Sequence, residues 1–89
     1  MNKNSERFLV FVRPALPLPE DADFKGTEQY LNWWRSKYKA DAYKLMEGGY
    51  VVITDTGSHD ELRKLLDAIP LSKKRQVRIE VLGLLPIDA

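Results

Sequence analysis

The chain of 89 residues contains no cysteine and a single histidine, His59. Without thiols it can form no disulfide and has no thiolate to serve as nucleophile or metal ligand. One imidazole with no ligand cluster beside it does not predict a metal site. The sequence also has no Gly-rich phosphate loop. We therefore expect neither a metal nor a cofactor, and we expect His59 to be solvent-exposed at the start of a helix.

Long apolar runs and an excess of charge of one sign are also missing. No run is long enough to cross a bilayer, and the polar residues 1–7 do not form the apolar core of a signal peptide. The 14 Lys and Arg residues nearly balance the 13 Asp and Glu residues, for a formal net charge of +1. Overall charge thus favours neither nucleic acid nor membrane as a partner. A cytoplasmic location is the expectation.

The composition that remains is typical of one globular domain spanning residues 1–89, with residues 1–6 as a flexible tail. Hydrophobic residues make up 44% and charged residues 30% of the chain, which is ordinary for such a domain. A chain of this size buries only about 60–65% of its extended surface. Association with further copies would therefore help to stabilise a modest core.

Residues 48–85 contain clear signals for two strands. Gly48 and Gly49 can both adopt positive φ, which predicts a two-residue hairpin turn. The β-branched residues 50–54 predict a buried strand. From Val77 on, apolar and polar residues alternate, which predicts a strand with one apolar face.

A helix is predicted between these strands. Ser58 and Glu61 have the spacing of a capping box. An apolar stripe at helical spacing follows, made by Leu62, Leu65, Leu66 and Ile69. Pro70 is expected to end this helix.

The first half of the chain supplies the remaining elements. Residues 7–13 (RFLVFVR) predict a central strand that ends at Pro14, and residues 42–46 predict a strand before the glycine turn. Residues 27–38 predict a helix capped by Thr27. The loop of residues 14–26 between them is either a lid or partner contact, or a proline-stiffened crossing.

The resulting order, βαββαβ, predicts an α+β protein of ferredoxin-like type: a four-stranded antiparallel sheet with two helices on one face. Right-handed crossovers place the first and third strands in the centre. We expect the helix-facing side chains to be Phe8, Val10, Val12, Val51, Ile53, Val77, Ile79 and Val81. We expect the opposite face to carry Leu9, Phe11, Arg13, Lys44, Tyr50, Val52, Thr54, Arg78, Glu80 and Leu82.

The second of these faces is too apolar to stay exposed on a monomer. A second copy of the chain, a small molecule or single-stranded nucleic acid could cover it. The RNA recognition motif has the same order of elements, but GYVVI at residues 49–53 lacks that motif's basic start and later aromatic, and the net charge supplies little attraction for phosphate. We expect no nucleic-acid partner, and a homo-oligomer of at least two chains.

Several segments are similar to the muconolactone isomerase family of small dimeric or multimeric α+β-barrel proteins. They are the strand ending in Asp55, the helix that Ser58 starts, Ile69-Pro70-Leu71, the strand of residues 79–84 (IEVLGL) and, after the first strand, Leu18-Pro19-Glu20-Asp21. The resemblance covers most of residues 48–84 and a few residues near the start. In the first strand, Leu9 and Phe11 stand where the isomerases have polar residues. The resemblance implies a dimeric α+β-barrel assembly.

It also implies transfer of a proton between carbons of a small unsaturated lactone or organic acid, which needs an acid/base and a group that stabilises an oxyanion. Glu80 is the candidate base, because it is the only carboxylate predicted in the middle of the covered face, where partial burial would raise its pKa. Arg78 and Arg13 are candidates for binding a carboxylate or oxyanion, and Tyr50 for donating a hydrogen bond. The alternative is a network of ion pairs across an interface in a non-catalytic assembly module.

A substrate on this face would contact Leu9, Phe11 and Val52. The pair Trp33 and Trp34 adds one more candidate, since two adjacent tryptophans cannot both point into the core from one helix. Trp34 shares a helical stripe with Tyr30 and Tyr38, so we expect it in the core. Trp33 is therefore expected at an edge, under a loop, in a contact between chains, or stacked on a ligand.

Overall fold

A sheet of four strands and three helices make up the computed structural model, which describes residues 6–15, 22–56, 58–73 and 77–87. The elements are β1 (Glu6–Pro14), α1 (Phe24–Tyr38), β2 (Asp41–Lys44), β3 (Tyr50–Thr56), α2 (His59–Asp67), α3 (Pro70–Lys73) and β4 (Val77–Leu84). The predicted order βαββαβ is confirmed, with the short helix α3 added after α2.

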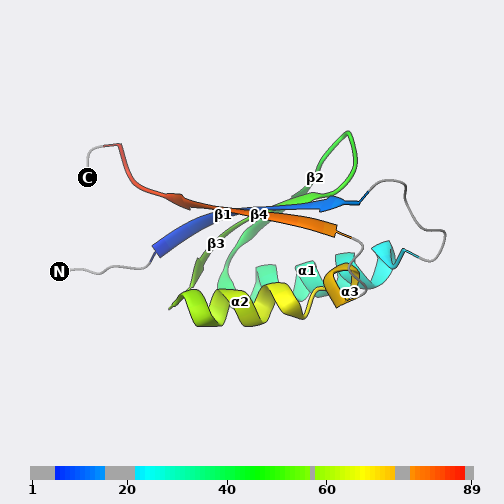
Figure 1. Ribbon diagram of the computed structural model, residues 1–89. Helices are drawn as coiled ribbons and strands as arrows, with labels where there is room; N and C mark the ends of the chain where they lie inside the picture. Colours follow the sequence, from blue (N-terminus) through cyan, green and yellow to red (C-terminus); the bar gives the residue numbers. More distant parts are fainter. Residues whose placement is uncertain (1–5, 16–21, 57, 74–76, 88–89) are drawn as a thin grey trace.

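The strands lie in the order β2-β3-β1-β4, and each neighbouring pair is antiparallel. The predicted central position of β1 and β3 is therefore confirmed. All three helices lie on one side of the sheet (Figure 1). This α+β architecture is compatible with a ferredoxin-like fold.

The other side of the sheet carries no helix in the described part of the chain, and we call it the open face. Residues directly opposite each other on neighbouring strands share a face, so the pairing register defines its members. They are Arg7, Leu9, Phe11, Arg13, Asp41, Tyr43, Val51, Ile53, Asp55, Arg78, Glu80, Leu82 and Leu84.

The hydrophobic core lies between the sheet and the helices. Trp34 lies in this core, as predicted, and is the largest fully buried side chain among the described residues. Its indole Nε1 donates to Oγ1 of Thr54 at 3.1 Å. Tyr30 closes the core on one side, because its hydroxyl donates to the backbone oxygen of Leu65 at 2.7 Å. These two bonds give the polar atoms of Trp34, Thr54 and Tyr30 partners within the fold, as is usual for buried polar groups.

The predicted faces of β3 were wrong. Thr54, Val52 and Tyr50 pair with the helix-facing residues of β1, and all three are buried. Val51 and Ile53 consequently lie on the open face. The side chains of residues 50–54 are apolar or β-branched at nearly every position, so the sequence did not show which of them face the helices. Periodicity therefore could not reveal its phase.

Lys44 was also predicted on the wrong face. It pairs with Tyr50 and therefore lies on the helix side, where its Nζ is 3.3 Å from Oε1 of Glu28. β2 ends at Lys44, two residues before the predicted end.

The connection from β2 to β3 is longer than the predicted two-residue glycine turn. The amide of Gly48 donates to the oxygen of Leu45 at 3.0 Å, which places Met46 and Glu47 at the corner. Gly48 and Gly49 follow with φ of 108° and 94°. The expectation of positive φ is confirmed for both, but they lie after the corner.

The helix ends match the predictions in part. Ser58 caps α2, accepting from the amide of Glu61 at 3.1 Å. The cap of α1 is Asp23, which accepts from the amide of Gly26 at 2.8 Å, so the predicted capping role of Thr27 was wrong. Thr27 is buried instead, and its Oγ1 accepts from the amide of Leu71 at 3.3 Å.

Some predictions fall outside the described residues. Of the predicted tail of residues 1–6, the structure describes only Glu6, which belongs to β1. Residues 16–21 of the long loop, which include the Leu18-Pro19-Glu20-Asp21 segment, are likewise outside. In the part that is described, no helix combines the length and apolarity needed to cross a membrane.

Candidate functional site

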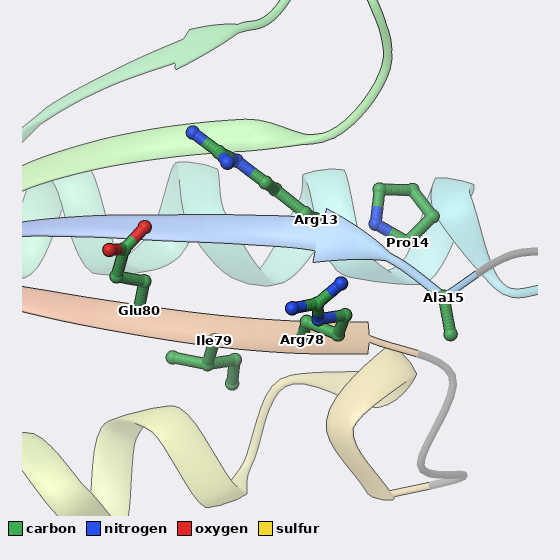
Figure 2. Close-up of a pocket in the computed structure, with 6 residues that line it drawn as sticks. All are labelled: Arg13, Pro14, Ala15, Arg78, Ile79 and Glu80. Atoms are coloured by element: carbon green, nitrogen blue, oxygen red, sulfur yellow. The ribbon is translucent and has the colours of Figure 1, made fainter.

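Two arginines and one glutamate converge where β1 ends on the open face. Arg13 of β1 lies directly opposite Arg78 of β4, and Glu80 lies opposite Phe11. These residues border a cleft of about 650 Å³ that is lined by Arg13, Pro14, Ala15, Arg78, Ile79 and Glu80. In Figure 2 the side chains of Arg13 and Glu80 rise from the surface opposite the helices, whereas Ile79 points toward them. The strand register thus brings together three of the charged residues singled out in the sequence.

The charges in this cleft have no ionic partners in the described part of the chain, where the ion pairs join Arg7 to Asp55 and Lys44 to Glu28. The guanidinium of Arg13 instead lies 4.4 Å from the ring centroid of Phe11. This cation–π contact orients the side chain without consuming its hydrogen-bond donors. Two neighbouring guanidinium groups with free donors can hold a carboxylate or another small oxyanion.

Glu80 is exposed in the single chain. The partial burial expected for it is therefore absent unless another molecule covers the open face. Its carboxylate is nevertheless positioned on the same surface as the two arginines (Figure 2). It could accept a proton from a ligand held there.

Apolar side chains continue the open face beside the cleft. Leu9 and Phe11 are half-buried, as are Val51 and Ile53 opposite them. Leu82, next to Leu9 on β4, is 43% exposed. The predicted apolar surface therefore exists, with Val51 and Ile53 in place of Tyr50 and Val52.

Tyr50 and Val52 are not part of this surface, so their predicted places in the site were wrong. Tyr50 is 5% exposed and its hydroxyl donates to Oε2 of Glu28 at 2.7 Å. Burial, reinforced by the Glu28 carboxylate, raises the pKa of Tyr50. The hydrogen bond from Tyr50, with help from Lys44, lowers the pKa of Glu28. This trio joins α1 to the β2–β3 hairpin on the helix side of the sheet.

No signal in the sequence identified Glu28. It lies in the first turns of α1, and only the packing of α1 against the hairpin brings its carboxylate to Tyr50 and Lys44. The groove beside these residues, about 130 Å³ in volume, is lined by Glu28, Leu31, Asn32, Ala42, Tyr43, Lys44 and Tyr50. It is too small for most organic ligands.

Trp33 lies on α1 and so belongs to the helix layer, away from the open face. It is 46% exposed, its ring stacks on Tyr30 with 5.4 Å between centroids, and Nζ of Lys37 lies 5.3 Å from the Trp33 centroid. Trp33 therefore lies outside the buried core, as expected for one of two adjacent tryptophans. The structure does not bring Trp33 together with the other candidate substrate contacts.

Metal ligands do not gather in the described residues, among which no three His, Cys, Asp or Glu side chains are placed to hold an ion. His59 is exposed at the start of α2, as predicted, and its ring lies edge-on to Phe8 with 5.1 Å between centroids.

The sequence matches no protein-family model and no curated protein.

Proposed function

We propose that this protein binds a small unsaturated organic acid or lactone in the cleft of the open face and transfers a proton on it, in the manner of a muconolactone isomerase. The observation that carries the proposal is the pair of facing arginines, Arg13 and Arg78, which have no ionic partner in the described chain and line a cleft with Glu80. The resemblance of residues 48–84 to the isomerases supplies the substrate class.

The roles follow from the chemistry of the side chains. The guanidinium groups of Arg13 and Arg78 hold the carboxylate or the lactone oxygen on which negative charge develops. Phe11 and Leu9 contact the apolar carbon skeleton. Glu80 accepts a proton from one carbon and returns it to another, as a general acid/base must.

The proposal includes a second copy of the chain that covers the open face, as in a dimeric α+β barrel. The face combines half-buried Leu9, Phe11, Val51 and Ile53 with the more exposed Tyr43 and Leu82, which are 58% and 43% exposed. Packing a second sheet against it would remove this surface from water. It would also exclude water from the surroundings of Glu80.

Binding is tested by titrating the protein with muconolactone and with small unsaturated dicarboxylates, followed by amide chemical shifts. We expect shifts around Arg13 and Arg78. Arg78→Gln should weaken binding by roughly 10- to 100-fold, because hydrogen bonds to charged groups contribute about 1.5–3 kcal/mol. Arg63→Gln on α2 is the matched control and should leave affinity unchanged. Equal affinity in both variants would exclude the arginine site.

Proton transfer is tested separately by incubating each ligand in deuterated water and following exchange of its carbon-bound protons by NMR. Glu80→Gln keeps the shape of the side chain but cannot accept the proton. We expect it to abolish exchange while leaving binding within a few-fold of the wild type. Exchange that persists in this variant would assign the base to another residue.

A second candidate function is a non-catalytic assembly module. It is favoured by the same unpaired charges, because Glu80 of one copy can pair with Arg13 or Arg78 of another across an interface. In that case no unsaturated acid binds, and both Glu80→Gln and Arg78→Gln weaken association of the chains.

A further inference from the structure

The two edges of the sheet differ strongly. β2 forms one edge with only four residues, Asp41–Lys44, and it begins and ends with a charge. β4 forms the other edge with eight residues, Val77–Leu84. Short and charged edges resist pairing with other chains, whereas a long apolar edge invites it.

The exposure of β4 fits an edge that is covered by another chain. Val81 is 39% exposed, although it points to the helix side, and Leu82 and Leu84 on the open face are 43% and 36% exposed. Beyond the strand, Leu85 and Ile87 are almost fully exposed as well. Val81 can therefore be covered by a strand paired along residues 77–81, and the two leucines continue the apolar edge beyond it.

We propose that two copies of this protein join through their β4 edges into one continuous eight-stranded sheet. The two β4 strands run antiparallel, with Ile79 of one copy directly opposite Ile79 of the other. Charge complementarity selects the second copy as the occupant. Arg78 and Glu80 lie two residues apart on the same face, so an antiparallel copy centred on Ile79 places Arg78 opposite Glu80 of the second copy, and Glu80 opposite Arg78. Opposite charges in directly paired positions stabilise a sheet.

Other antiparallel registers also keep the open faces of the two copies on the same side of the sheet, but they pair the charged residues less favourably. Centring the pair on Glu80 places two glutamates directly opposite each other, and centring it on Arg78 does the same for two arginines. Centring it on Val81 places both charges opposite leucines. The register centred on Ile79 also pairs Val77 with Val81 on the helix side, which shields the exposed Val81.

Edge pairing changes the cleft. The row of open-face residues would run from Arg13 and Arg78 of one chain to Glu80 and Phe11 of the other. Each pair of arginines thereby gains a carboxylate from the second copy, and the two clefts meet at the seam. The edge pairing itself does not depend on ligand binding. Only this shared composition of the ligand site rests on the proposed function.

The absence of native cysteine allows a clean test by single-cysteine crosslinking. In Ile79→Cys the two thiols lie in directly opposed residues, whose Cα atoms are about 4.5–5.5 Å apart and within disulfide reach. In Val81→Cys they lie about 14 Å apart along the strands. We expect Ile79→Cys to form disulfide dimers at least tenfold faster than Val81→Cys at micromolar concentration. Equal rates, or faster crosslinking of Val81→Cys, would overturn the register.

Charge reversal gives a second measurement that does not depend on the Ile79 substitution being tolerated. Arg78→Glu and Glu80→Arg each place like charges opposite one another, and each should weaken association in sedimentation experiments by roughly tenfold or more. The double variant restores both pairs and should restore association. If the three variants associate equally, or if the wild type is monomeric, the edge pairing is wrong.

Val51→Lys separates this edge contact from the face contact of the proposed function. It introduces a charge on the open face of β3, two strands away from the β4 edge. Crosslinking of Ile79→Cys should persist in the presence of Val51→Lys, whereas loss of crosslinking would refute an independent edge contact. Crosslinking that persists in a protein unable to bind unsaturated acids would refute the proposed ligand and leave the edge contact standing.

Discussion

Replacing Thr54 with valine tests the orientation of β3 and the polar link at the centre of the core. The Thr54 hydroxyl accepts from the indole N–H of Trp34 at 3.1 Å, and the two residues are 1% and 0% exposed. Valine has nearly the same shape as threonine but provides no acceptor. Thr54→Val would therefore leave a buried N–H group unpaired with little change in packing.

The magnitude follows from these two effects. A buried donor without an acceptor costs about 1–3 kcal/mol, and the additional apolar surface of valine recovers less than about 1 kcal/mol. We expect the free energy of unfolding to fall by about 1–2 kcal/mol. For a domain of this size the Tm should fall by roughly 4–16 °C.

Urea denaturation followed by tryptophan fluorescence and far-UV circular dichroism, at one fixed protein concentration, measures this loss. Thr54→Ser keeps the acceptor and should be less destabilised than Thr54→Val. Val51→Thr makes the reverse exchange on the open face, where water can reach the hydroxyl of a dissociated chain, and should cost less than about 1 kcal/mol. If Thr54→Val were as stable as the wild type or more so, Thr54 would not face Trp34 and the orientation of β3 would be wrong.

The turn after β2 and the buried tyrosine give further predictions. Gly49→Ala would place a Cβ 2.5 Å from the oxygen of Val12 at a φ of 94°, and it should lower the free energy of unfolding in urea by about 2–3 kcal/mol. In Gly48→Ala the added Cβ meets nothing within 4 Å, so the loss should be only about 1–2 kcal/mol. The lowered pKa of Glu28 means that its carboxylate stabilises the fold at neutral pH and that this contribution is lost as the pH falls below 4.5, so Glu28→Gln should flatten the acid decline in Tm. The raised pKa of Tyr50 means that its contribution is full below pH 10.0 and is lost as the pH rises further, so Tyr50→Phe should retain its Tm better than the wild type in alkali; an identical alkaline decline in both proteins would contradict this.

The parts of the fold that could be predicted are those with a local signal. Ser58 precedes an apolar stripe with helical spacing, and it does cap α2. The order of elements, together with the handedness of crossovers, was enough to place β1 and β3 in the centre. The orientation of β3 had no such signal, because apolar residues stand at both parities and the choice depends on partners in α1.

The face on which a site residue lies could be predicted only where its strand alternates clearly between apolar and polar residues. Arg78 and Glu80 belong to a strand with clear alternation, and the open face holds both of them. Tyr50 belongs to the ambiguous strand, and it lies on the opposite side. Its partner Glu28 depends on a contact between residues far apart in the sequence, which no local pattern encodes.

The sheet register also has a consequence for chain connectivity. Arg7 near the start of β1 pairs with Leu84 at the end of β4, and the β2–β3 corner carries the fully exposed Met46. Joining the end of β4 to the start of β1 and opening the chain at that corner would give the order β3, α2, α3, β4, β1, α1, β2. Apart from the short α3, this circularly permuted chain again reads strand, helix, strand, strand, helix, strand. The fold thus consists of two interlocked strand–helix–strand halves, either of which can come first.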